Sequence, residues 1–474
     1  MRLYVRNARL DQNGEILPLG LLCEEGKITR ILRANDCPAP DLDQALDALP
    51  NGPGMQISQT DGSTAIDAGG LLLLPGGVDP HTHFDLDIGF TKASDDFATG
   101  SVAALCGGTT TVIDHMAFGP DGCHLLHQYS KYQDLAKDCS CDYGLHGVLQ
   151  HLGGTVIDDF SLLKDKGVSS LKLYMTYAFK LDHDIALKAL QRAKELDMTV
   201  CVHCEDDSLL QETRRRFVSE GKTNPSFHGK SRPPEAEAIA VRRILDLARK
   251  AGDARIYVVH LSTALGLEEI RKARKAGQEN IFAETCPQYL LLDESAYDRP
   301  DALKYVMSPP IRSKSDAEAL WDGLAKGDID TIGTDHCPFF YETQKQRGAS
   351  DFALAPNGAP GVELRMPLML SEGFLKRKIS LSRVIELCCS NPARIFGLSQ
   401  KGSLNDFQDA DFALYSTEDT AVTAESLHEN VDYTPYEGMI LKASPKLVVL
   451  RGELMAANGK FLGSKGTGSY IFRK

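Results

Sequence analysis

The 474-residue sequence has no excess of basic residues and no long apolar run. Its formal net charge of −13 argues against nucleic acid or an anionic membrane as a main partner, because both favour basic surfaces. No stretch approaches the length of a transmembrane helix, and the start, MRLYVRNARL, lacks the apolar core of a signal peptide. The 12 cysteines are too sparse for a disulfide scaffold. We therefore expect a globular, cytoplasmic protein.

The two ends of the chain share a pattern that the middle lacks. Residues 1–66 contain short alternating segments typical of strands, although 35–63 is rich in Pro, Gly and Asp and predicts a mobile surface insertion. Strand patterns return after residue 399, at 410–415, 439–443 and 447–450. We therefore predict a small β-sandwich domain formed from both termini, residues 1–67 and 399–474, around a central domain over 68–398.

The central region alternates short β-rich runs with amphipathic helices, a pattern that predicts a TIM (β/α)8 barrel of the α/β class. On one helix Ala240, Ile244 and Leu247 share a face, and Ser315 with Glu318 has capping-box spacing before another helix. The eight predicted strands are Val78–His83, Thr109–Asp114, Tyr143–Gln150, Ser169–Tyr174, Thr199–His203, Ile256–His260, Ile281–Glu284 and Ile329–Thr334. Reactive side chains of such barrels come from the carboxyl ends of the strands.

A pair of histidines closes the first of these strands. In Leu71–Phe84, LLLLPGGVDPHTHF, His81 and His83 are two residues apart, so in a strand they point the same way and can share a metal ion. Taken alone, such a pair is more often part of a polar loop. Further candidate ligands decide between the two interpretations.

Four more candidate ligands close later strands. They are Lys172, His203, His260 and Asp335. Each alone could be a rim, core or capping residue, but independent chance explains poorly why all of them end strands of one barrel. A lysine inside an apolar strand is costly to bury as an ammonium, whereas a lysine carboxylated by CO2 becomes a carbamate that can bridge two cations. The set suits two divalent ions, with zinc expected from the imidazoles.

The motifs HTH, SLKLYMTY, VHCE, VVHLS, ETCPQYLLLD, SPPIR, GTDHCPF and NGAPGVE, in this order, resemble those of cyclic amidohydrolases in the amidohydrolase superfamily. The most similar branch is that of the hydantoinases and dihydropyrimidinases. The resemblance implies that His81 and His83 hold one metal, that His203 and His260 hold the other, and that N6-carboxylated Lys172 bridges them. It further implies that Asp335 completes the first site and carries a proton to the leaving ring nitrogen.

The resemblance also implies three substrate contacts. Tyr177 would donate to the developing oxyanion, and Ser308 and Asn357 would hold the cyclic ureide through backbone groups. Without the resemblance, Tyr177 would be interpreted as a rim aromatic and the other two as turn residues. The nearby His115, His151 and His336 are expected to be partners of the ligands or packing residues.

The loop after the histidine pair bears on the substrate. Dihydroorotases carry an arginine two residues after this pair to hold a carboxylate, but here that position is Asp85. The loop FDLDIGFTKASDD is similar to the phenylhydantoinase type, which implies an apolar mouth for a bulky 5-substituent. The candidate gate residues are Phe84, Leu86, Ile88, Phe90, Phe118 and Phe179. Each could equally pack its loop onto the barrel.

The expected reaction is hydrolytic opening of a 5-substituted hydantoin to an N-carbamoyl amino acid. Dihydropyrimidinase activity on dihydrouracil is the first alternative, because it uses the same residues. A non-catalytic assembly protein similar to the collapsin response mediators is the second, although those relatives have lost metal ligands that are all present here. The resemblance also implies a homotetramer, or else a dimer.

Overall fold

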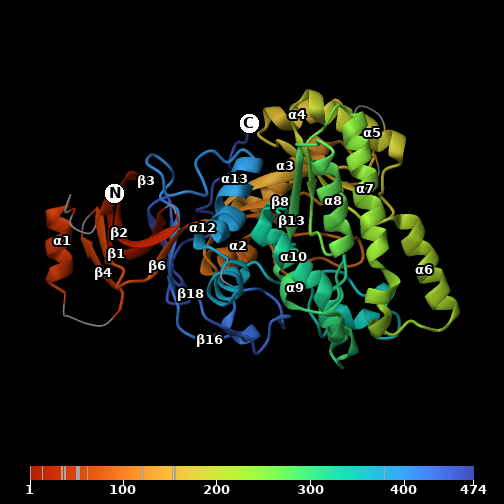
Figure 1. Cartoon of the computed structure of the whole chain (residues 1–474). Helices are drawn as coiled ribbons and strands as arrows, with labels where there is room; N and C mark the ends of the chain where they lie inside the picture. Colours follow the sequence, from red (N-terminus) through yellow and green to blue (C-terminus); the bar gives the residue numbers. More distant parts are fainter. Residues whose placement is uncertain are drawn as a thin grey trace.

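The computed structural model describes residues 2–12, 14–33, 36, 39–49, 54–60, 62–117, 119–120, 122–151, 153, 156–377 and 379–474. Two bodies lie side by side: a sheet built from both ends of the chain, and a larger barrel of strands surrounded by helices (Figure 1). Within the described ranges no helix is both long enough and apolar enough to span a membrane.

All eight predicted barrel strands are present, and they pair in chain order as one parallel sheet. The first and last strands meet at their carboxyl ends, where Asp335 N donates to His81 O (2.9 Å) and His83 N donates to His336 O (3.0 Å). The predicted barrel is therefore confirmed. The strands are β7 (Gly77–Thr82), β8 (Thr109–His115), β9 (Asp142–Val148), β10 (Ser170–Tyr174), β11 (Thr199–His203), β12 (Ile256–Val258), β13 (Ile281–Thr285) and β14 (Thr331–Ile332).

Helices follow the strands and cover the outside of the barrel (Figure 1). The predicted apolar face of α7 is buried, whereas the cap of α10 lies two residues earlier than predicted, because Ser313 accepts from Asp316 N. The helices are α2 (Phe97–Cys106), α3 (Leu125–Leu135), α4 (Asp159–Asp165), α5 (His183–Glu195), α6 (Asp207–Ser219), α7 (Pro234–Lys250), α8 (Ala264–Lys275), α9 (Pro287–Leu291), α10 (Lys314–Lys326), α11 (Arg365–Leu368), α12 (Leu381–Ile385) and α13 (Asn391–Ile395).

The second body is one mixed sheet to which both termini contribute, as predicted. Its order is β20-β19-β18-β15-β6-β1-β2-β3, and β5 also pairs with β1 and carries β4. Its strands are β1 (Arg2–Gln12), β2 (Glu15–Glu24), β3 (Lys27–Arg33), β4 (Gln56–Thr60), β5 (Ser63–Asp67), β6 (Leu72–Pro75), β15 (Phe412–Ser416), β18 (Ser444–Leu450), β19 (Glu453–Ala457) and β20 (Lys460–Phe461). Because β6 belongs to this sheet, we propose that the barrel begins at Gly76, slightly later than expected.

Two details of the terminal body differ from the prediction. The described part of 35–63 is not simply a surface insertion, because it contains β4 and the helix α1 (Pro40–Asp47), whose Leu42 and Leu46 pack against the sheet. The strand predicted at 439–443 is the short β17 (Ile440–Leu441), which pairs with β16 (Thr420–Ala421) in a separate ribbon. Which strands pair there depends on tertiary packing, which the local sequence pattern does not encode.

A buried ionic cluster joins the two bodies. The Lys401 ammonium lies 2.5 Å from Asp142, 2.8 Å from Asp409 and 2.7 Å from Asp411. Arg451 also pairs with Asp142. The three carboxylates could hold a metal ion by their spacing, but the lysine side chain already lies among them. We therefore interpret this cluster as a structural contact between the two bodies.

Candidate active site

The six candidate metal ligands gather at the carboxyl end of the barrel. His81 lies on β7 and His83 follows it, and Nε2 of each lies close to the same Asp335 oxygen, at 3.1 and 3.0 Å. On the other side the His203 and His260 rings have centroids 4.6 Å apart, and the His260 ring centroid is 5.5 Å from that of His81. These side chains come from five different strands or strand ends, so only closure of the barrel brings them together.

Lys172 is the sixth member of this cluster. It lies on β10 with only 1% of its surface exposed, and burial lowers the pKa of its amine. The fit to metal ions rests on the donor set: imidazoles, a carboxylate and a buried lysine amine. His260 Nδ1 is buried and makes no hydrogen bond with any described residue, and His81 Nε2 is buried facing the Asp335 oxygen at 3.1 Å. Buried nitrogens of this kind are suited to divalent ions.

A cavity of about 1060 Å³ opens beside the cluster. Five of the six candidate ligands line it, all except His81. Tyr177, Ser308 and Asn357, which lie far apart in the sequence, line it too. Ser308 Oγ and Asn357 Oδ1 are buried and make no hydrogen bond with the described residues. The structure thus brings the predicted substrate contacts and the metal-ligand cluster into one cavity.

The sequence profile of the amidohydrolase family matches residues 72–455. The chain belongs to this family. It is 44% identical to a D-phenylhydantoinase of Escherichia coli O1:K1 over 424 residues, which are 89% of this chain and 92% of that protein. The structural match to the dihydropyrimidinase of Brevibacillus agri NCHU1002 (36% identity, TM-score 0.91) covers 100% of this chain and 99% of that protein's chain. The D-hydantoinase of Bacillus sp. AR9 (34% identity, TM-score 0.90) covers 99% of each chain.

These similarities confirm a cyclic amidohydrolase of the hydantoinase and dihydropyrimidinase type. They confirm the enzyme interpretation over that of a non-catalytic assembly protein. Amidohydrolases are metal-dependent, which agrees with a histidine cluster that could hold an ion in this chain.

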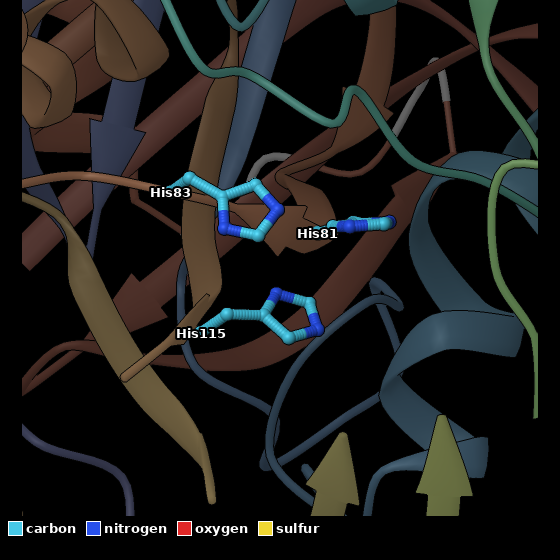
Figure 2. Close-up of side chains that lie close together, drawn as sticks. All are labelled: His81, His83 and His115. Carbon is cyan, nitrogen blue, oxygen red and sulfur yellow. The ribbon is translucent and has the colours of Figure 1, made fainter. Parts of the chain in front are cut away.

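The amidohydrolase site contains a histidine that sequence analysis left among the neighbours. Figure 2 shows His115 of β8 beside His81 and His83, and ligand atoms of the three lie within 4.8 Å of one another. His115 and Asp335 are therefore rival third ligands for this pair. We favour Asp335, because it contacts both histidines and lines the cavity, whereas His115 does not line the cavity and stacks on His146 as well as on His83.

Three candidate site residues have an unusual backbone. The φ angles of Tyr177, His260 and Asp335 are 74°, 40° and 54°, in the left-handed region that side-chain-bearing residues seldom adopt. Such conformations cost of order 1–3 kcal/mol each and occur mainly where the surrounding structure enforces them. All three residues line the cavity, where the surrounding structure enforces this conformation.

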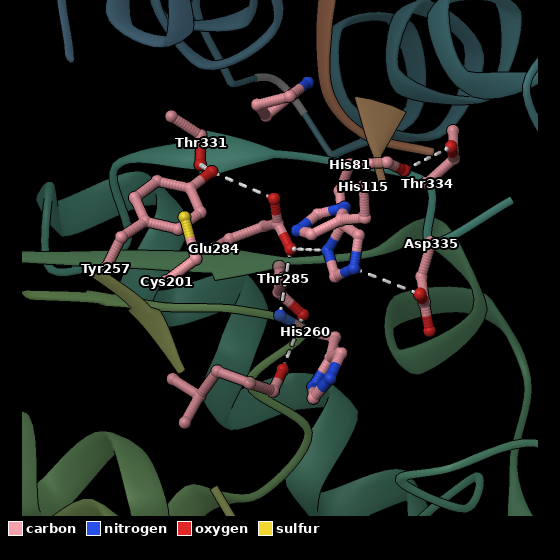
Figure 3. A network of polar contacts seen from close by, with 12 residues as sticks. His81, His115, Cys201, Tyr257, His260, Glu284, Thr285, Thr331, Thr334 and Asp335 are labelled. Atoms are coloured by element: carbon pink, nitrogen blue, oxygen red, sulfur yellow. Dashed lines mark hydrogen bonds and ion pairs between the residues drawn. The ribbon is translucent and has the colours of Figure 1, made fainter. Parts of the chain in front are cut away.

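Two buried carboxylates orient the histidines, and sequence analysis missed both. Glu284 at the end of β13 lies 2.6 Å from His81 Nδ1 and accepts from the Tyr257 hydroxyl (2.8 Å) and His260 N (2.9 Å), as Figure 3 shows. Glu205 lies 2.8 Å from His203 Nε2. The available signal was an acidic residue inside an apolar strand end, IFAET, and another directly after one, VHCED.

The charges around His81 favour a cation. Burial alone would lower the pKa of His81, but the carboxylates of Glu284 and Asp335 raise it to about 9. Burial lowers the pKa of His83 to about 4, so His83 is neutral with a free lone pair. Positive charge is thus stabilised at the position where a metal ion would provide it.

We expect Glu284→Gln to weaken metal binding by about 10–100-fold, the usual effect of removing a carboxylate that orients a ligand histidine. Competition for zinc with a chelating dye measures this. Glu372→Gln is the matched control, because Glu372 is also buried but pairs with Lys376 (2.9 Å) away from the site. Equal zinc affinity in Glu284→Gln and wild type would remove Glu284 from this role.

The structure places four of the six candidate gate residues on the wall of the cavity and one in the core. Leu86, Ile88, Phe90 and Phe179 line the cavity. Phe84 does not: its ring is fully buried, 5.6 Å from the Phe97 ring, because its backbone turns the side chain into the core. Phe118 lies outside the described residues.

Proposed function

We propose that this enzyme opens 5-substituted hydantoins, preferring aryl substituents, and releases N-carbamoyl amino acids. The observation that carries this proposal is the size and the lining of the cavity. A cavity of about 1060 Å³ has the candidate ligands on one side and Leu86, Ile88, Phe90 and Phe179 on its walls. Apolar and aromatic walls favour a bulky apolar substituent. Similarity to a D-phenylhydantoinase supports the same substrate class.

We propose that His81, His83, Lys172 and Asp335 hold one divalent ion and that Lys172, His203 and His260 hold a second, with zinc as the metal. Lys172 would bridge them as an N6-carboxylysine, since a buried amine beside several nitrogen ligands can bridge two ions only after gaining anionic oxygens. When bound, such ions lower the pKa of a water molecule and polarise a carbonyl oxygen.

Asp335 and Tyr177 would carry the proton and the charge. As water adds to the ring amide carbon, Asp335 takes its proton, and the Tyr177 hydroxyl donates to the carbonyl oxygen as negative charge develops there. Burial raises the pKa of Tyr177, so the hydroxyl remains a proton-bearing donor. The ring C–N bond then breaks, and Asp335 returns the proton to the leaving nitrogen. Ser308 and Asn357 would orient the ring through their backbone groups.

The test is steady-state turnover of zinc-supplemented enzyme on 5-phenylhydantoin and on dihydrouracil. Burying a phenyl group contributes about 2 kcal/mol, so we expect kcat/KM to favour the aryl hydantoin by roughly 30-fold. Phe179→Ala is expected to reduce that preference while leaving dihydrouracil opening nearly unchanged. Phe407→Ala is the control, because Phe407 is 76% exposed and does not line the cavity.

Opening of dihydrouracil or dihydrothymine is the second candidate function. Its support is the dihydropyrimidinase of Brevibacillus agri, which matches this chain over its whole length. Preference for dihydrouracil in the same assay would replace the hydantoin proposal with this one.

Assembly and compartment are proposals as well. We propose a homotetramer, or a dimer, on the family resemblance. The cytosol is the proposed compartment, because the described cysteines are free thiols and most are buried, as is usual in reducing surroundings.

A further inference from the structure

Lys345 is a fully buried lysine in the loop after β14, with none of its surface exposed. Its ammonium donates to two backbone carbonyls, Val306 O at 2.8 Å and Pro356 O at 3.3 Å. Among the described residues no carboxylate lies within ion-pair distance of it. A buried amine without a counter-charge is costly, and burial lowers its pKa to about 7. A position with this cost calls for a specific use.

The two carbonyls belong to the segments that carry the proposed ring contacts. Val306 is two residues before Ser308, and Pro356 directly precedes Asn357. Gly358 N also donates to Val306 O (3.1 Å), so the segments touch where the lysine joins them. Lys345 itself does not line the cavity. It therefore acts on the ring-binding groups from behind.

Its neighbour Gln344 reaches a different segment. Gln344 Nε2 donates to Thr91 Oγ1 (2.6 Å) and to Lys92 O (2.7 Å), next to Phe90 of the proposed gate. Two adjacent residues thus hold two parts of the site: Lys345 holds the ring segments, and Gln344 holds the gate loop. This arrangement predicts that their effects on catalysis can be separated.

We propose that Lys345 is a positioning residue that fixes the spacing of the Ser308 and Asn357 segments and so the orientation of the bound ring. The role rests on the proposed function, because it presumes that these segments hold a cyclic ureide. Displacing bound groups by about 1 Å can cost roughly 100-fold in rate. Since 5-phenylhydantoin and dihydrouracil present the same cyclic ureide group, in rings of five and six members, loss of this contact acts on both alike.

Three variants separate the roles. Lys345→Met is expected to lower kcat/KM about 10–100-fold for both 5-phenylhydantoin and dihydrouracil, with their ratio kept within about twofold and metal content unchanged. Gln344→Ala is expected to change the ratio. Lys304→Met is the control and should change neither, because Lys304 pairs with Asp301 (3.4 Å) and makes no contact with the two carbonyls.

Hydrogen exchange tests, without turnover, whether Lys345 holds the Ser308 and Asn357 segments together. Peptides covering 304–312 and 354–361 should exchange faster in Lys345→Met than in wild type and Lys304→Met. If Lys345→Met does not fold, Lys345→Arg replaces it, since the larger guanidinium should push the carbonyls apart with the same effects. Unchanged exchange, or faster exchange with unchanged kcat/KM, overturns the proposal. A wild-type enzyme that opens neither ring contradicts the proposed function. Hydrogen exchange still decides in that case whether Lys345 holds the segments.

Discussion

Asp335→Asn is expected to lower kcat at least about 10³-fold on any ring that the enzyme opens. A positioned general acid–base group contributes typically 10²–10⁴-fold, and here the same side chain also contacts His81 and His83. The amide keeps the shape of the carboxyl group but can neither take nor return a proton. Stopped assays at high enzyme concentration measure the residual rate.

The fold of Asp335→Asn should be intact, because the side chain is a near isostere and is partly exposed to the cavity. Circular dichroism and thermal unfolding check this. Asp328→Asn is the matched control, because Asp328 lies just before the same strand but pairs with Arg271 (2.7 Å) on the outside. Turnover within tenfold of wild type in folded Asp335→Asn would exclude this residue as the proton carrier.

Lys172→Ala should lose both the bridge between the ions and most activity. The lysine is 1% exposed on β10, and the short alanine side chain that replaces it cannot reach the other candidate ligands. We expect a loss of at least about 10³-fold in kcat, comparable to removal of a group that stabilises the transition state, together with reduced zinc content. Short carboxylic acids should restore part of the activity, because they can occupy the place of the carbamate.

Lys188→Ala is the control for this experiment, since Lys188 lies on α5, the helix that follows the same strand, and is exposed there. Activity equal to wild type in Lys172→Ala would contradict the carbamate proposal. Failure of every added acid to restore any activity, with zinc still bound, would show that the lysine acts in another way.

The barrel and the cluster could be predicted from sequence for a simple reason. Buried parallel strands are short apolar runs, and their last residues meet at one edge, so strand order alone places His81, Lys172, His203 and Asp335 together. Their gathering at the carboxyl end of the barrel agrees with that reasoning.

Contacts across the barrel could not be predicted in the same way. Nothing local indicates that Glu284 reaches His81 or that Lys345 joins two distant segments. The misplaced Phe84 has the same origin: a loop residue beside the pair can point into the mouth or into the core, and only tertiary packing against Phe97 decides. The period of a strand determines on which face of the sheet each side chain lies, whereas the side chains of a loop follow no such period.

The central claim, a metal-activated cyclic amidohydrolase centred on these six side chains, is tested most directly by metal titration. Enzyme stripped with a chelator is assayed on 5-phenylhydantoin and dihydrouracil as zinc is added, with bound metal measured in the same samples. We predict no turnover without metal and a rise that saturates at about two ions per chain, the arrangement of two-metal hydrolytic sites. Full activity without bound metal, or a metal-loaded enzyme that opens neither ring, would contradict it.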